Sequence, residues 1–94
     1  MKYIKRPVLV EAVEFKGVDP IHKTLLFDEK PHWLSDALWS DTIIIRENGD
    51  LAIRTLEGIM TAKRGYFIIR GVEGEIYDCE PSIFIKTYEE AEIR

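Results

Sequence analysis

The sequence predicts one small α+β domain over residues 1–94, and three features of the chain predict it. Its 94 residues are the size of a single ordinary domain. Apolar residues recur at helical spacing in residues 31–39, and at a spacing of about two between glycines in residues 42–79. We therefore expect an N-terminal strand, one or two short helices and a largely antiparallel four-strand meander. A meander curled into a partial barrel is an open alternative.

The first strand is predicted over residues 7–15, PVLVEAVEF. The segment is rich in β-branched residues, which favour strands, and Gly17 ends it. Apolar side chains alternate onto both faces, with Val13 and Phe15 on one face and Ala12 on the other. Because both faces are apolar, we expect this strand to lie in the centre of a sheet.

Two segments favour short helices. Asp19 followed by Pro20 suits the cap and the first position of a helix, with apolar residues further along on one side. The second segment, PHWLSDALW over residues 31–39, places apolar side chains on one helical face: Trp33, Leu34, Ala37 and Leu38. That face should cover one side of a sheet.

The dipeptide Asn48-Gly49 lies between two apolar runs and predicts a tight two-residue hairpin turn. Such a turn places Ile45 opposite Ala52 on the two strands that it joins. The hairpin tip carries acidic residues, so we expect the tip to lie in solvent.

Glu73-Gly74 predicts a second two-residue hairpin, which pairs Arg70 with Tyr77. The glycines of this half of the chain recur at strand-length intervals: Gly58, Gly65 and Gly74. Glycines of a phosphate-binding loop cluster at the start of a helix instead. The spacing therefore indicates turns in a sheet.

Pro81 ends the last predicted strand. The segment PSIFIKTYEEAEI that starts there fits either a short terminal helix or an extended edge segment. Ser82 would cap the helix in the first case. Residues 89–94 are rich in glutamate and are expected to fray into solvent.

Composition and charge disfavour several classes of protein. The net charge is −4 and the basic residues are spread along the chain, which disfavours nucleic-acid binding. Glu11 and Glu14 interrupt the only apolar run near the N-terminus, so a secretory signal is not expected. Without a stretch of about 20 apolar residues, a membrane span is not expected either. We expect a soluble protein of the cytosol.

Catalytic and metal-binding patterns are weak. Cys79 is the only cysteine, which fits a reducing compartment, and His22 and His32 lie in a different part of the chain. Cys79 thus has no nearby base in the sequence, and a half-buried strand residue is the favoured interpretation. These residues match no common metal-ligand spacing. We expect no cofactor and no enzymatic activity.

Charged and aromatic residues in the predicted elements are the candidates for a binding site. Arg54 and Arg70 would rise from one sheet beside Tyr77 and could hold a carboxylate or a phosphate. In the alternative, each arginine covers apolar surface with its stem and pairs with a nearby carboxylate. The candidate binding residues are Trp33, Arg54, Glu57, Arg70, Glu75 and Tyr77.

The segments WLSDAL, NGDLAIRTLEG and RGYFIIRGVEGEIYDCEPSIFIKTYEE, with the opening KYIKRPVLVEAVEF, resemble a family of short bacteriophage and prophage proteins. Members of that family read TLEG, a Gly-Asp-Tyr turn, IIRGV-x-GE, Y-Pro-Cys, P-x-IF and TYE. The resemblance covers almost the whole chain. It implies phage origin and a small accessory role in the cytosol of the host bacterium, and it supplies no catalytic residue.

This chain departs from that pattern at several positions. Tyr66 stands where the family has the aspartate of its turn, and Asp78 replaces the proline before Cys79. Glu80 and Ser82 replace a commonly basic and a commonly acidic residue. Any chemical role of the turn aspartate would be lost in this chain.

Three functions are consistent with these observations. The favoured hypothesis is a non-enzymatic phage accessory protein that binds a host or phage macromolecule. The alternatives are a protein that binds an anionic metabolite or nucleotide through Arg54 and Arg70, and a minor virion component. A homodimer formed through a sheet edge or a helix face is also expected, because a domain of this size buries a limited fraction of its surface.

Overall fold

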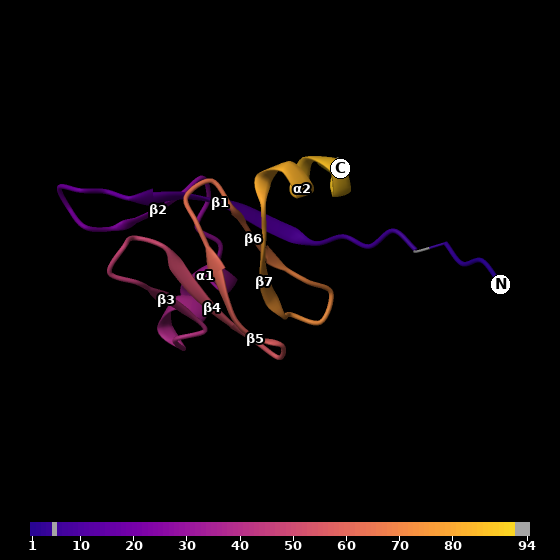
Figure 1. Cartoon of the computed structure of the whole chain (residues 1–94), viewed down its shortest axis with the longest axis horizontal. Helices are drawn as coiled ribbons and strands as arrows, with labels where there is room; N and C mark the ends of the chain where they lie inside the picture. The colour runs from indigo at the N-terminus through magenta and orange to yellow at the C-terminus, as the bar shows by residue number, and fades with distance from the viewer. Residues whose placement is uncertain (5, 92–94) are drawn as a thin grey trace.

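Strands form two antiparallel sheets in the computed structural model, which describes residues 1–4 and 6–91 (Figure 1). The first sheet has the order β2-β1-β6-β7 and the second the order β3-β4-β5. The bounds are β1 Glu11–Val18, β2 Leu25–Phe27, α1 His32–Trp39, β3 Ile43–Ile45, β4 Leu51–Thr55, β5 Gly58–Ala62, β6 Phe67–Arg70, β7 Ile76–Cys79 and α2 Pro81–Thr87. The predicted α+β class is confirmed, and over these residues the sheets do not close into a barrel.

The predicted meander divides between the two sheets. Strands β3, β4 and β5 follow one another as a meander, whereas the β6–β7 hairpin pairs with β1. Strand β1 lies between β2 and β6, so its predicted central position is confirmed. It begins at Glu11 and not at residue 7, because the preceding residues leave the sheet and Val8 and Leu9 are exposed.

The helix predicted to begin at Asp19 is wrong. The Asp19 carboxylate accepts a hydrogen bond from the backbone N–H of Ile21 at 2.9 Å, but only a turn follows, and the chain returns along β1 as β2. Phe27 of β2 lies opposite Phe15 of β1, with 5.5 Å between the ring centroids. Packing against the buried Phe15 therefore outweighs the local helix signal.

The helix predicted over residues 31–39 is confirmed as α1. Pro31 occupies its N-cap, and Leu34 and Ala37 are buried. Trp33 is half-buried against the core, whereas Trp39 at the end of the helix is 89% exposed. The apolar face of α1 therefore covers the sheets, as its spacing predicts.

The core lies where α1 and the inner faces of both sheets meet. A single cluster of buried side chains contains Val13, Phe15, Leu34, Ala37, Ile43, Leu51, Ile53, Ala62 and Ile68. Helix α1 and both sheets contribute side chains to this cluster, so burial of apolar surface holds the two sheets together.

The predicted register of the first hairpin is wrong by one residue. Gly49 donates its N–H to the carbonyl of Arg46 at 2.9 Å and has φ +90°, and Ile45 pairs with Leu51 instead of Ala52. This is a turn followed by a glycine in the left-handed region, which adds one residue to the loop. Because side chains alternate between faces, residues that were predicted to face each other across the hairpin lie on opposite faces of the sheet.

The β6–β7 hairpin differs from the prediction in the same way. Gly74 donates its N–H to the carbonyl of Gly71 at 3.0 Å with φ +84°, and Arg70 lies opposite Ile76. Tyr77 lies opposite Ile69. The predicted pairing of Arg70 with Tyr77 is therefore wrong, and the two side chains leave the sheet on opposite faces.

Helix α2 covers part of the outer face of the first sheet. The Phe84 ring stacks on that of Phe67 with 3.8 Å between centroids, and Tyr88 stacks on Phe84 at 5.0 Å. The helical alternative for this segment is thus the one observed. Ser82 does not cap it, because Glu80 is the N-cap residue and makes no side-chain cap. Residues 89–91 follow without helix or strand, and residues 92–94 of the predicted frayed tail lie outside the described residues.

Residues 1–4 and 6–10, called the arm below, extend from β1 past α2 and away from β3, β4 and β5 (Figure 1). Tyr3 is 85% exposed, Ile4 94% and Leu9 68%. The radius of gyration is 14.2 Å, against about 12 Å for a compact domain of this length. The arm therefore contributes apolar side chains that the core does not use.

Candidate binding groove

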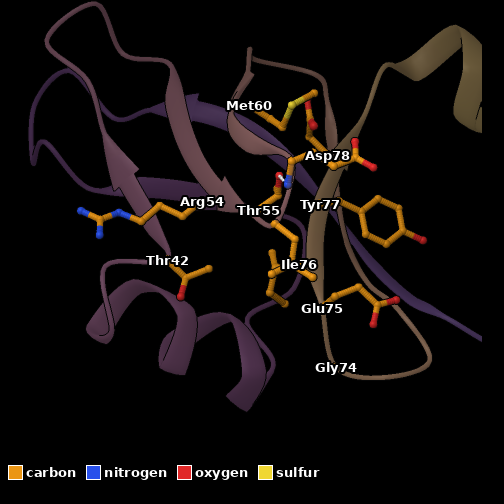
Figure 2. Close-up of a pocket in the computed structure, with 11 residues that line it drawn as sticks. Thr42, Arg54, Thr55, Met60, Gly74, Glu75, Ile76, Tyr77 and Asp78 are labelled. Atoms are coloured by element: carbon orange, nitrogen blue, oxygen red, sulfur yellow. Dashed lines mark hydrogen bonds between the residues drawn. The ribbon is translucent and has the colours of Figure 1, made fainter.

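The candidate residues fall into two groups in the structure. Four of the six line a groove between β7 and the β4–β5 hairpin: Arg54, Glu57, Glu75 and Tyr77. The groove has a volume of about 770 Å³ and is also lined by Thr42, Thr55, Leu56, Met60, Gly74, Ile76 and Asp78 (Figure 2). The other two candidates, Trp33 and Arg70, lie outside it.

The β4–β5 turn positions one wall of the groove. The Thr55 hydroxyl donates to the carbonyl of Gly58 at 2.7 Å and accepts from the N–H of Glu57 at 3.2 Å. Gly58 has φ +119°, a conformation that side chains with a Cβ rarely adopt. This tight turn holds Glu57 and the fully exposed Leu56 at the rim.

Strand β7 forms the other wall and is the last strand of its sheet. Gly71 donates its N–H to the carbonyl of Glu75 at 2.8 Å, so the next hydrogen-bonded positions along the ladder are Tyr77 and Cys79. The backbone N–H and C=O of Ile76 and Asp78 therefore point away from β6. Among the described residues, β7 pairs with β6 alone, so its outer edge has no strand partner, and β4 and β5 lie beside it.

The groove is acidic. Its lining contains three acidic residues, Glu57, Glu75 and Asp78, and one basic residue, Arg54. The Glu75 carboxylate accepts a hydrogen bond from the backbone N–H of Glu73 at 3.0 Å, within the β6–β7 turn. Burial raises the pKa of Asp78, and a hydrogen bond from its own backbone N–H opposes this rise. Figure 2 shows the Arg54 and Tyr77 side chains projecting in opposite directions, so they do not converge on one ligand.

Arg70 and Trp33 instead share a partner on β1. The Arg70 guanidinium lies 3.7 Å from one carboxylate oxygen of Glu11, and the Trp33 indole N–H donates to the other oxygen at 3.0 Å. Glu11 therefore links α1 to β6. The expected pairing of Arg54 and Arg70 at one site is not observed.

The Tyr77 hydroxyl lies on the α2 side of the sheet. It is 3.3 Å from the hydroxyl of Tyr88, and burial together with this hydrogen bond raises the pKa of Tyr77. The phenol is therefore neutral at physiological pH. Its contact with Tyr88 joins β7 to the residue that ends α2.

Cys79 is a half-buried residue of β7, as predicted. Burial and the carboxylates of Asp78 and Glu80 raise its pKa. The thiol therefore stays protonated at neutral pH, in which form it is a poor nucleophile. His22 lies beside Asp19, with 2.8 Å between the ring Nδ1 and a carboxylate oxygen.

The described residues contain no group of three or more His, Cys, Asp and Glu residues arranged to hold a metal ion. No helix in this part of the chain has both the length and the apolar character needed to cross a membrane.

A second groove of about 770 Å³ lies on the opposite face of the first sheet. It is bounded by the base of the arm, by Phe67 and by Phe84 and Tyr88. Its floor is the aromatic contact between α2 and β6. This groove contains none of the candidate binding residues.

Sequence reasoning missed seven of the eleven residues that line the acidic groove, among them Leu56, Met60 and Asp78. For Asp78 a signal existed, because side chains alternate along a strand and Asp78 therefore lies on the same face as Ile76. Leu56 and Met60 become groove residues only because β7 lies beside β4 and β5. That contact joins different sheets and has no local sequence pattern.

Comparisons of the chain with protein-family models, with curated proteins and with solved structures find no match among any of the three. The resemblance to short phage proteins stays a prediction.

Proposed function

We propose that this protein is a non-enzymatic phage accessory protein that acts in the host cytosol by binding a macromolecular partner in the acidic groove. The partner is a protein that presents an extended segment with basic and apolar side chains. The observation that carries this proposal is the unpaired edge of β7 in a groove lined by acidic residues and by exposed apolar side chains.

Each part of the groove selects one property of that segment. An open strand edge binds extended backbone through main-chain hydrogen bonds. Leu56 and Met60 are exposed apolar side chains that a partner would bury. The carboxylates favour Lys or Arg over acidic side chains, because like charges brought together cost free energy.

The charge of the groove does not favour an anionic ligand. Arg54 shares the groove with three carboxylates, and Arg70 is held by Glu11 outside it. An anion at Arg54 would lie near these carboxylates. The virion hypothesis has no support in the geometry, and mass spectrometry of purified particles tests it.

Affinity capture from lysate of phage-infected bacteria tests the proposed function. The wild-type chain should retain a partner that Glu57→Lys/Glu75→Lys loses, because the double variant reverses the charge of the groove. The matched control is Asp36→Lys/Glu47→Lys, which makes the same change at exposed positions outside the groove. Equal retention by both variants, or no partner above the empty resin, would contradict the proposal.

A further inference from the structure

The arm has the chemistry that the acidic groove selects. Lys2 and Arg6 are exposed cations, and Ile4 between them is 94% exposed. In an extended segment, residues 2, 4 and 6 lie on one face because side chains alternate. The arm therefore presents a cation, an apolar side chain and a second cation in a row.

The groove contains residues of complementary chemistry. Glu57, Glu75 and Asp78 belong to the same lining as the exposed Leu56 and Met60. Along β7 the lining runs over residues 74–78, five consecutive positions, or about 17 Å of extended chain. A fully extended stretch from Lys2 to Arg6 would match this length, and residues 7–10 would connect it to β1.

The direction of the arm favours binding to a second copy. It leaves β1 past α2 and runs away from β4 and β5, which form one wall of the groove in the same chain (Figure 1). To reach its own groove it would have to reverse direction. A second chain can receive it without that reversal, and a two-fold arrangement then fills both grooves reciprocally.

We propose that two copies of this chain form a two-fold dimer in which the arm of each copy adds as a strand to the β7 edge of the other. Lys2 and Arg6 meet the carboxylates of the acidic groove, and Ile4 covers Leu56 and Met60. The inference rests on the proposed binding role of the groove and names a second copy as an occupant. A macromolecular partner would then have to displace the arm, and binding would convert the dimer to monomers.

The solution mass, measured by light scattering during size-exclusion chromatography, tests the dimer. The wild-type chain should have the mass of two chains at low salt, and the mass should fall as added salt screens the ion pairs. Lys2→Glu/Arg6→Glu should be monomeric, and so should Glu57→Lys/Glu75→Lys. The matched control Lys23→Glu/Lys30→Glu changes exposed lysines outside the arm and should stay dimeric.

Mixing the two monomeric variants gives the sharpest result. In the mixture, the acidic arm of one chain meets the basic groove of the other, and the wild-type arm meets the wild-type groove. A dimer should reappear in the mixture only. A mixture that stays monomeric, or single variants that stay dimeric, would overturn the proposal.

Different experimental results would contradict the proposed function and the proposed dimer. A monomeric wild-type chain that still captures a lysate protein, and loses it in Glu57→Lys/Glu75→Lys, overturns the dimer and leaves the proposed function standing. A monomeric wild-type chain in which Lys2→Glu/Arg6→Glu lowers the melting temperature indicates that the arm folds back on its own chain, and this also overturns the dimer. If mixing the two charge variants restores the dimer, but the groove variant captures the same lysate proteins as the wild-type chain, the dimer is supported and the proposed macromolecular partner is contradicted.

Discussion

Among the single residues of the groove, Asp78 is a partly buried carboxyl on an edge strand. Its side chain lies on the face of β7 that is turned toward the second sheet, and burial raises its pKa. A carboxyl with a raised pKa is less stable as the anion in the folded chain than in the unfolded chain. Asp78 therefore contributes negative charge to the groove at some cost in stability.

This cost predicts a pH-dependent effect of Asp78→Asn. Because the folded-state pKa of Asp78 is raised, its ionisation lowers stability as the pH rises from the ordinary value of 3.8 through the raised value. Asp78→Asn should thus increase the free energy of unfolding at pH 7, and the gain should vanish near pH 3. Urea denaturation at both pH values measures it, with Asp36→Asn as the control. An equal gain at both pH values would contradict the account.

At the scale of elements, helix α2 is attached mainly through aromatic side chains. Its seven residues include no buried one, and Phe84 between Phe67 and Tyr88 is its main contact with the first sheet. A helix this short is not stable on its own in water. Its position therefore depends on the stacked rings.

Phe84→Ala should consequently detach α2. We expect a loss of about 1–3 kcal/mol in the free energy of unfolding, because the change removes a half-buried ring and two aromatic contacts. Ile85→Ala on the same helix is the control, since Ile85 is 75% exposed and its loss should change stability by less than about 0.5 kcal/mol. Thermal and urea unfolding of both variants give the comparison. Equal effects of the two changes would show that the stack does not hold the helix.

At the scale of the whole molecule, local patterns predicted the α+β class, helix α1 and the central position of β1. The strand registers of the β3–β4 and β6–β7 hairpins were not predictable from the dipeptides Asn48-Gly49 and Glu73-Gly74 alone. Gly49 and Gly74 fit a two-residue turn and a longer turn equally well, since both require a left-handed glycine. Strand β2 forms because Phe27 packs on Phe15, a contact that a local window does not contain.

The candidate site was predicted only in part for the same reason. Arg54, Glu57, Glu75 and Tyr77 were correctly placed in strands and turns, but their meeting depends on β7 lying against the second sheet. Arg70 lies on β6 opposite Glu11, whereas Arg54 lies on β4 of the other sheet, and this separation also belongs to tertiary structure. Sequence alone indicated which residues were candidates and could not indicate which of them share a surface.

A nuclear magnetic resonance titration of the Lys2→Glu/Arg6→Glu chain with a peptide of residues 1–10, MKYIKRPVLV, tests whether the acidic groove binds a basic extended segment. The acidic groove of that chain is unchanged. We predict that the largest amide shift changes map to residues 55–60 and 74–78, and that Glu57→Lys/Glu75→Lys abolishes them. Shift changes confined to other surfaces, or equal changes in the groove variant, would contradict the claim that this groove binds a basic extended segment.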